Sequence, residues 1–195
     1  MNTILQQELK KILNGRFSQS ESTRLNYSRG EDTYDPILSK AVVFPETNEE
    51  VSKILKLCNE HKVPVVPFGT GTSLEGNVVG NDKGITISLE KMNKVLSVNT
   101  QDFDCRVQAC VTREQLNDYL REDGVFFPID PGANAAIGGM ASTSASGTMA
   151  VKYGTMKTVI TGLTVVLPNG EIMNTGGRTK KTSAGYNLTN LFVGS

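Results

Sequence analysis

Apolar residues recur at helical spacing in the first fourteen positions. Leu5, Leu9, Ile12 and Leu13 would share one side of a helix over residues 1–14, with polar residues on the other side. This arrangement predicts a short amphipathic helix at the start of the chain. The next polar stretch is interpreted as an irregular lead-in spanning residues 15–35.

A strand–helix–strand pattern follows the lead-in. Residues 41–44 are an apolar strand stopped by Pro45, and residues 63–66 are a second one. Between them, Thr47 is followed three residues later by Glu50, which is the form of a capping box at a helix start. This order predicts a parallel βαβ unit. The apolar positions of its helix, at i, i+3, i+4 and i+7, are Val51, Ile54, Leu55 and Cys58.

Later segments carry further strand, helix and turn signals. Residues 85–89 and 105–109 alternate apolar and polar positions, as half-buried strands do. Asn169-Gly170 between two apolar runs predicts a hairpin. Residues 191–195 are interpreted as the beginning of an apolar strand. Thr112 repeats the capping-box pattern. The helix after it is expected to place Leu116, Tyr119 and Leu120 on an apolar face and to end at a C-terminal cap formed by Gly124.

A glycine-rich loop, residues 67–80, directly follows the second predicted strand. Glycines let the backbone turn sharply, so that several N–H groups can converge on an anion such as a diphosphate. A glycine-rich turn without any ligand is the alternative. A dinucleotide-binding Rossmann loop is excluded because Leu74 stands at the third glycine position. A P-loop is excluded because Asn77 follows Gly76.

Residues 132–150 form a second segment of small residues, being Gly, Ala, Ser or Thr at all but four positions. Small residues let the backbone approach a flat ligand closely. A flexible linker is a weak alternative because Ile137, Met140 and Met149 interrupt the run, and tight packing of a buried turn is another. Two donor-rich segments about 60 residues apart favour one extended cofactor with a diphosphate over a small metabolite.

Composition and charge narrow the classes of function. Lys and Arg number 20 and so do Asp and Glu, which leaves no basic excess for nucleic-acid binding. Lys180-Lys181 is more typical of a solvated surface. No secretory signal and no apolar run of ~20 residues is present, so no transmembrane segment is expected and a cytoplasmic location is predicted.

The three cysteines and the one histidine are expected to be structural. Without CxxC spacing they predict neither a metal site nor a disulfide framework. Cys58 lies on the apolar helix face, and Cys105 and Cys110 would point to opposite faces of a strand. His61 ends the first of the capped helices, where a positive charge favours the helix dipole.

Six ordered motifs between residues 40 and 195 resemble those of the FAD-linked oxidase family, which has the p-cresol methylhydroxylase (PCMH) type of FAD-binding domain. The resemblance is strongest to D-lactate dehydrogenase (cytochrome) and the glycolate oxidase flavin subunit. Many ordered motifs are more specific than any single one. They are Pro67–Gly76, Phe126–Ala133, Gly138–Ala141, Ala145–Thr148, Tyr153–Met156 and Ser183–Leu188.

The resemblance implies an α+β fold, a PCMH-type FAD-binding domain made of two packed α/β subdomains. Residues 1–39 would be the helix and lead-in, residues 40–100 the first subdomain, and residues 101–195 the second. The second subdomain is expected to be incomplete and the substrate domain absent, so that the chain is C-terminally truncated. Some relatives attach FAD covalently through a histidine where this chain has Thr72, so non-covalent FAD is expected.

The resemblance also assigns candidate site residues. The first segment would cradle the FAD diphosphate and the second would line the isoalloxazine and ribityl parts, with amides near 69–73 and 132–146 converging on a single flavin nucleotide. No catalytic or metal-binding residue is expected in this chain, since the family's substrate domain supplies them. The expected cofactor-binding residues are Pro67, Phe68, Gly69, Thr70, Gly71, Thr72, Ser73, Leu74, Asp130, Pro131, Gly132, Ala136, Gly138, Gly139, Thr143, Ser144, Ala145, Ser146, Gly147, Tyr153 and Gly154.

The activity implied by the resemblance is oxidation of a D-2-hydroxyacid, such as D-lactate or a glycolate-like acid, to a 2-oxoacid. Electrons would pass to an acceptor such as cytochrome c or a quinone, and this chain alone is expected to be inactive. Two alternatives remain open at this point. One is another FAD-linked oxidoreductase of the same fold, similar to alkyl-dihydroxyacetonephosphate synthase or a sugar oxidase, and the other is a non-catalytic fragment.

Overall fold

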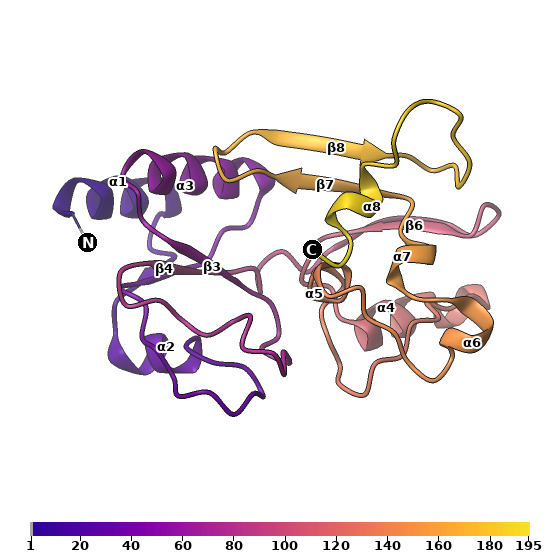
Figure 1. Ribbon diagram of the computed structural model, residues 1–195, viewed down its shortest axis with the longest axis horizontal. Helices are drawn as coiled ribbons and strands as arrows, with labels where there is room; N and C mark the ends of the chain where they lie inside the picture. Colours follow the sequence, from indigo (N-terminus) through magenta and orange to yellow (C-terminus); the bar gives the residue numbers. More distant parts are fainter. Residues whose placement is uncertain (1) are drawn as a thin grey trace. The chain divides into compact units, whose positions relative to one another are not determined.

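The computed structural model describes residues 2–195, which form two compact units (Figure 1). The first unit runs to Met92 and also takes in Val166–Met173, whereas the second comprises Asn93–Val165 and Asn174–Ser195. The boundaries expected from the sequence, after residues 39 and 100, differ from this division. The lead-in belongs to the first unit, and the tip of a late hairpin returns to it.

The first unit is built on a four-stranded sheet in the order β1-β2-β4-β3. Both β2 and β3 pair in parallel with β4, and β1 pairs antiparallel with β2. The predicted parallel βαβ unit is therefore confirmed, with β4 inserted between its two strands. The strands are β1 Phe17–Ser18, β2 Val42–Val43, β3 Val65–Phe68 and β4 Ile85–Ser88.

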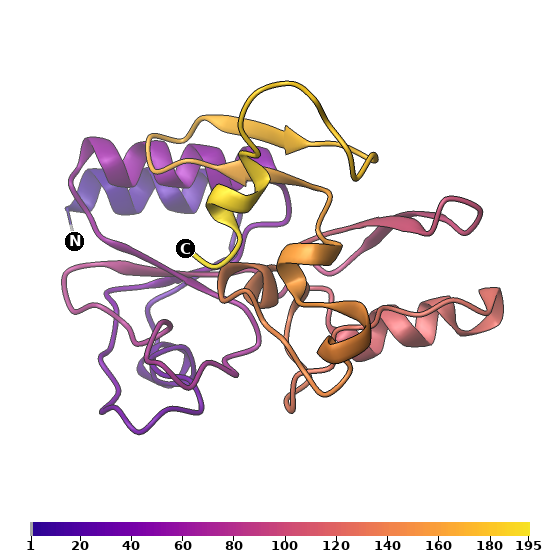
Figure 2. The ribbon, with the colours of Figure 1, turned by 45° about the vertical axis from the view of Figure 1, so that its right-hand side comes forward.

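Two helices, α1 (Thr3–Leu13) and α3 (Asn48–Glu60), lie side by side against one face of this sheet (Figures 1 and 2). The predicted N-cap of α3 is confirmed, because the Thr47 Oγ1 accepts a hydrogen bond from the Glu50 N–H at 3.2 Å. Both helices bury apolar stripes, which stabilises the unit. The buried core consists of Leu5, Leu9, Leu13, Ala41, Val43, Ile54, Cys58, Ile85 and Ile87.

Two expectations about this unit are wrong. The strand expected to be half-buried is buried along its whole length, because Ile85 and Ile87 face the apolar core and Thr86 and Ser88, on the opposite face, are covered as well. Its polar Thr86 tolerates burial because its Oγ1 is hydrogen-bonded to the Ser39 Oγ at 2.8 Å. The lead-in also contains regular structure, namely β1 and the helix α2 (Glu21–Asn26), which begins at the N-cap Ser20.

The second unit begins with an antiparallel pair, β5 (Val95–Asn99) and β6 (Asp104–Val107), of which only β6 was expected. The helix α4 (Arg113–Leu120) starts at its predicted cap, and the 3-10 turn η1 (Arg121–Asp123) extends it. Gly124 ends the turn with φ +68°, as predicted. Leu116 and Leu120 are buried beside Val111, whereas Tyr119 is 59% exposed and does not join the apolar face.

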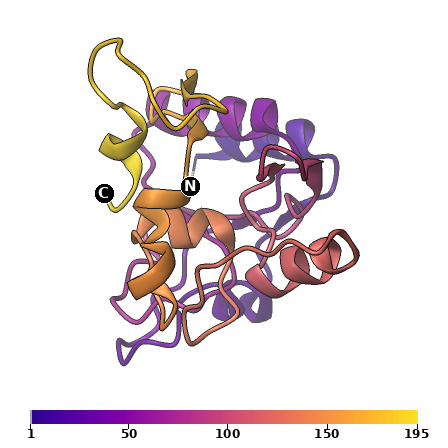
Figure 3. The ribbon, with the colours of Figure 1, turned by 90° about the vertical axis from the view of Figure 1, so that its right-hand side faces the viewer.

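The small-residue segment and the residues that follow it fold into short helices: α5 (Ile137–Ser142), α6 (Ala150–Tyr153) and α7 (Met156–Val159) (Figure 3). Met140 and Met156 are almost fully buried. They pack in one cluster with Ile129, Ala141 and Val193. The segment has its own core and is therefore no flexible linker.

The C-terminal part contains the predicted hairpin, formed by β7 (Gly162–Val166) and β8 (Ile172–Gly176). Its turn is closed by a hydrogen bond from the Leu167 N–H to the Glu171 carbonyl, with Gly170 at φ +85°. The strand expected over residues 191–195 is wrong, because a four-residue helix, α8 (Thr189–Phe192), occupies this place. Within residues 2–195 no helix is long and apolar enough to cross a membrane.

Candidate cofactor-binding site

The glycine-rich loop leaves the end of β3 over a buried aromatic ring. Gly71 has φ +75°, and a Cβ added there would lie 2.8 Å from the Phe68 Cζ, so both the backbone conformation and the space require glycine. The Phe68 ring is itself held by Tyr27, with ring centroids 5.1 Å apart. Phe68 is 5% exposed, and its buried side chain packs under the loop at Gly71. Pro67 lies within β3, opposite Ile87 of β4.

Several hydrogen-bond donors in this loop have no acceptor. The Ser73 Oγ is buried and without a partner among residues 2–195. Within the same residues, no acceptor lies within hydrogen-bond reach of the N–H groups of Thr72 and Leu74. The buried Ser73 hydroxyl costs free energy unless a ligand supplies a partner, whereas the N–H groups of Thr72 and Leu74 lie at half-buried and exposed positions that a ligand can reach. The loop therefore fits the diphosphate of a dinucleotide cofactor, whose oxygens would accept these hydrogen bonds.

In the second unit, Asp130 organises the small-residue segment. Its carboxylate accepts hydrogen bonds from the Thr148 hydroxyl at 2.5 Å and from the Met149 N–H at 2.9 Å. These two bonds, with a smaller contribution from Arg113, hold the pKa of the Asp130 carboxyl below its ordinary value. A Cβ at Gly147 would lie 2.2 Å from the Asp130 carbonyl oxygen. Asp130 thus fixes the turn at residues 147–149.

The expected contact residues of this segment fall into packed and open positions. Ala136 is buried and bridges to Thr112, and a Cβ at Gly138 would lie 2.8 Å from the Ala109 carbonyl oxygen. These positions are explained by packing. The positions open to a flat ligand are Gly132 and Gly139, which have free space where a Cβ would point, and the exposed Thr143 and Ser146.

The remaining expected residues of the segment have local roles. Ser144 adopts φ +47°, and the Ala145 N–H donates to the Met140 carbonyl at 2.8 Å. The Tyr153 ring packs edge-on against another aromatic ring. Gly154, at φ +82°, faces Thr158. Pro131 is half-buried in the turn before Gly132.

Arg113 is a candidate site residue that the sequence patterns did not identify. Arg113 begins α4, and its backbone N–H donates to the Ala135 carbonyl in the small-residue segment at 3.1 Å. Its Nε is buried and has no hydrogen-bond partner among residues 2–195. A guanidinium in this state suits an anionic or carbonyl group. An arginine directly after a helix N-cap was the available signal.

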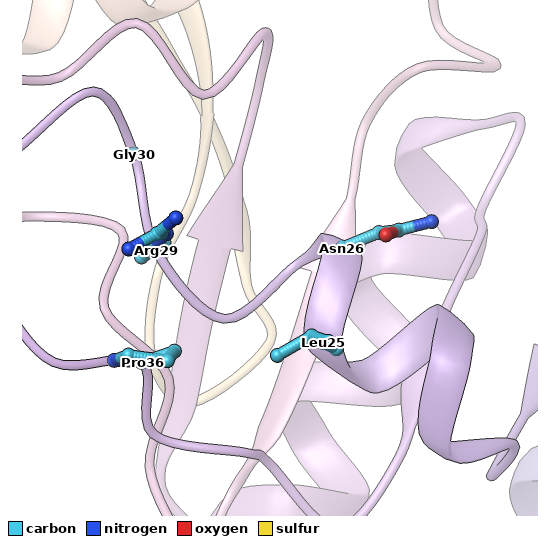
Figure 4. A pocket seen from close by; sticks show the side chains of 5 residues that line it. All are labelled: Leu25, Asn26, Arg29, Gly30 and Pro36. Carbon is cyan, nitrogen blue, oxygen red and sulfur yellow. The ribbon is translucent and has the colours of Figure 1, made fainter.

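The cavity in the first unit, the potential metal ligands and His61 give no second candidate site for a cofactor among residues 2–195. A cavity of about 420 Å³ in the first unit is lined by α2 and the following loop, where Leu25 points across toward Pro36 and Asn26 points away (Figure 4). Residues 2–195 contain no group of three or more His, Cys, Asp and Glu side chains that could hold a metal ion. His61 is the C-cap of α3, where it was placed from the sequence.

Three comparisons with known proteins agree on the class of domain. A family model described as an FAD binding domain matches residues 39–176. The probable mitochondrial D-lactate dehydrogenase of Danio rerio is 49% identical over 181 residues, covering 91% of this chain and 36% of that protein. The mitochondrial D-lactate dehydrogenase (cytochrome) of Arabidopsis thaliana is 43% identical, with 96% and 34% covered. The glycolate oxidase subunit GlcD of Bacillus subtilis is 36% identical, with 92% and 38% covered.

Solved structures show the same fold. Alkyldihydroxyacetonephosphate synthase superposes with a TM-score of 0.87 at 22% identity, over 100% of this chain and 38% of that one. p-Cresol methylhydroxylase superposes with a TM-score of 0.79 at 24% identity, over 97% and 40%. The expected α+β fold of the PCMH type is thereby confirmed. The chain spans about a third of the length of the curated relatives it matches.

Proposed function

Because this chain belongs to the family of PCMH-type FAD-binding domains, we propose that it is the FAD-binding part of a flavoenzyme that oxidises a D-2-hydroxyacid to a 2-oxoacid. Bound FAD supplies the two-electron redox chemistry. The residues of this chain bind and orient the cofactor. The observation that carries the proposal is the loop after β3, where the buried Ser73 Oγ and the N–H groups of Thr72 and Leu74 lack an acceptor among residues 2–195.

The second unit supplies a segment suited to the flat part of the cofactor. Gly132 and Gly139 leave space beside the backbone, and Thr143 and Ser146 offer hydroxyl groups. Arg113, whose Nη2 is paired with Glu114, offers its buried and unpartnered Nε beside the same segment. We propose that this segment contacts bound FAD, as few well-placed polar groups suffice to orient such a ligand.

Attachment of FAD is proposed to be non-covalent. The only histidine of the chain caps α3, and the family resemblance places Thr72 at the loop position at which some members carry a linking histidine. Flavin should therefore separate from the protein after acid precipitation. Flavin that remains with the denatured protein would contradict this assignment.

The substrate class rests on the relatives. Two of them are described as D-lactate dehydrogenases and one as a glycolate oxidase subunit, and all three names specify 2-hydroxyacid oxidation. A cytochrome as electron acceptor is supported in the same way by one of these names. Since the chain spans about a third of these proteins, we propose that substrate binding and base catalysis use residues outside it.

Titration of the purified chain with FAD, followed by flavin fluorescence, tests the proposal. The wild type should bind FAD, and Gly71→Ala should weaken binding about tenfold or more, because the added Cβ meets the Phe68 ring and forces the loop to move. Gly177→Ala is the matched control, since a Cβ there has nothing within 4 Å. Equal binding by both variants would refute the assignment of the loop.

A second measurement addresses the substrate. D-lactate should leave the visible spectrum of the FAD-loaded chain unchanged under anaerobic conditions, and it should bleach the flavin of a longer polypeptide in which this FAD-binding part is joined to a substrate-binding part. Bleaching of the 195-residue chain by D-lactate would show that the substrate site lies within it. Failure of the longer polypeptide to respond to D-lactate or glycolate would refute the substrate class.

A further inference from the structure

The segment between α2 and β2 packs directly on the backbone of the glycine-rich loop. A Cβ added at Gly30 would lie 2.6 Å from the carbonyl oxygen of Ser73 and 2.9 Å from that of Gly71. Contacts below 3.0 Å with backbone atoms cannot be relieved by a side-chain rotation. Only glycine at position 30 therefore permits this approach.

The contact fixes the direction of two peptide groups. In a planar trans peptide the carbonyl oxygen of one residue and the N–H of the next point in opposite directions. No cis peptide bond occurs in residues 2–195. Since the carbonyl oxygens of Gly71 and Ser73 face Gly30, the N–H groups of Thr72 and Leu74 point away from it. These are two of the donors that lack an acceptor among the same residues.

The same segment also holds the far end of the loop. A Cβ at Gly76, which has φ +73°, would lie 2.7 Å from the Tyr34 Cε2, so this ring covers the backbone there. The Gly80 N–H donates to the Ser28 carbonyl at 2.9 Å. Residues 28–34 thus contact the loop at Gly71 and Ser73, at Gly76 and at Gly80.

Asp32 gives this segment its shape. Its carboxylate accepts hydrogen bonds from the N–H groups of Gly30 and Tyr34, both at 3.0 Å. Side-chain-to-backbone bonds over two residues are typical of Asp in turns. The carboxylate therefore joins the glycine that faces the loop carbonyls to the tyrosine that covers Gly76.

We propose that residues 28–34, with Gly30 at their centre, are a positioning element that aims the N–H groups of Thr72 and Leu74 at the cofactor diphosphate. The element lies outside the range matched by the FAD binding domain model, which begins at residue 39. The role in cofactor binding rests on the proposed function. The effect on the loop backbone does not, because it follows from contacts within the first unit.

Backbone amide chemical shifts and FAD affinity, measured on the full chain, test the proposal together. Gly30→Ala should move the amide signals of Thr72 and Leu74 without FAD present, and it should weaken FAD binding about tenfold or more. Asp32→Ala removes two hydrogen bonds without adding bulk and should act in the same direction, which provides a test if Gly30→Ala does not fold. Gly177→Ala, where an added Cβ has open space, should change neither quantity.

The outcomes separate the two proposals. Unchanged amide signals of Thr72 and Leu74 in both Gly30→Ala and Asp32→Ala would overturn the positioning role. Shifted signals with undiminished FAD affinity would overturn its connection to the cofactor. A wild-type chain that binds no FAD would count against the proposed function, and the amide signals of the ligand-free variants would still decide whether residues 28–34 position the loop.

Discussion

Replacement of Glu50 by Gln tests whether an ion pair at the start of α3 holds the first unit together. The Arg16 guanidinium donates to both oxygens of the Glu50 carboxylate, at 2.6 and 2.5 Å, and also to the Phe44 carbonyl at 2.9 Å. The Glu46 N–H donates to the same carboxylate at 2.7 Å. The pair thereby joins the segment before β1, the end of β2 and the start of α3.

The magnitude follows from the burial of the pair. The side chains of Arg16 and Glu50 are 20% and 19% exposed, which places them between a surface pair and a fully buried one. Surface pairs contribute about 0–1 kcal/mol, whereas breaking a buried pair costs about 3–5 kcal/mol. Glutamine keeps the shape and one acceptor. We therefore expect Glu50→Gln to lower the free energy of unfolding by about 2 kcal/mol, equivalent to a fall in Tm of about 4–8 °C for a chain of this size.

The pH dependence has a definite sign. Hydrogen bonding to Arg16 is the largest cause that lowers the pKa of Glu50 below its ordinary value of 4.5. A group with a lowered pKa in the folded state stabilises the fold above its unfolded pKa and loses this contribution as the pH falls through the folded value. The difference in stability between wild type and Glu50→Gln should be full at neutral pH and should shrink below about pH 4.5.

Urea unfolding followed by far-UV circular dichroism measures both effects. Glu49→Gln is the control, because it removes the same charge from the same helix turn at an exposed position without an ion pair in residues 2–195. Arg16→Met and the double variant complete a thermodynamic cycle, in which the double variant should lose less than the sum of the two. Equal losses in Glu49→Gln and Glu50→Gln, or a difference that does not change with pH, would refute the reasoning.

Three further predictions concern other parts of the chain. Met140→Ala should lower the free energy of unfolding by about 2–5 kcal/mol in a urea titration, because Met140 is 1% exposed inside the core of the second unit; a loss near zero would show that this core collapses around the gap. Cys58, whose pKa burial raises to about 12, should resist iodoacetamide in the native chain and react after unfolding, and rapid native modification would contradict its burial. Asp130→Asn should speed hydrogen exchange at the Met149 amide, since a neutral amide oxygen is a weaker acceptor than the carboxylate; unchanged exchange would show that the turn holds without the charge.

Sequence motifs only a few residues long were sufficient to predict two helix starts and one hairpin turn. The capping patterns at Thr47 and Thr112 start α3 and α4, and Asn169-Gly170 forms the turn between β7 and β8. These features depend on residues three or four positions apart, so the sequence alone reveals them. The family resemblance added the fold class, which local patterns could not supply.

What was missed depends on contacts that are distant in sequence. Thr86 is buried against Ser39, a buried residue 47 positions earlier in the chain, which no alternation within the strand reveals. A short apolar run such as residues 191–193 does not distinguish a strand from a helix, and here it lies in and after α8. Gly30 stood in a stretch interpreted as irregular, although its importance comes from backbone atoms more than 40 positions away, at Gly71 and Ser73.

Hydrogen–deuterium exchange of the chain with and without FAD tests the central claim most directly, because it reports on both donor-rich segments in one experiment. We predict that FAD slows exchange in residues 69–76 and also in residues 132–147, while the exposed segment at residues 178–188 exchanges as before. Absence of protection from residues 69–76 would contradict the assignment of the glycine-rich loop to FAD, and its absence from residues 132–147 would contradict the assignment of the second segment.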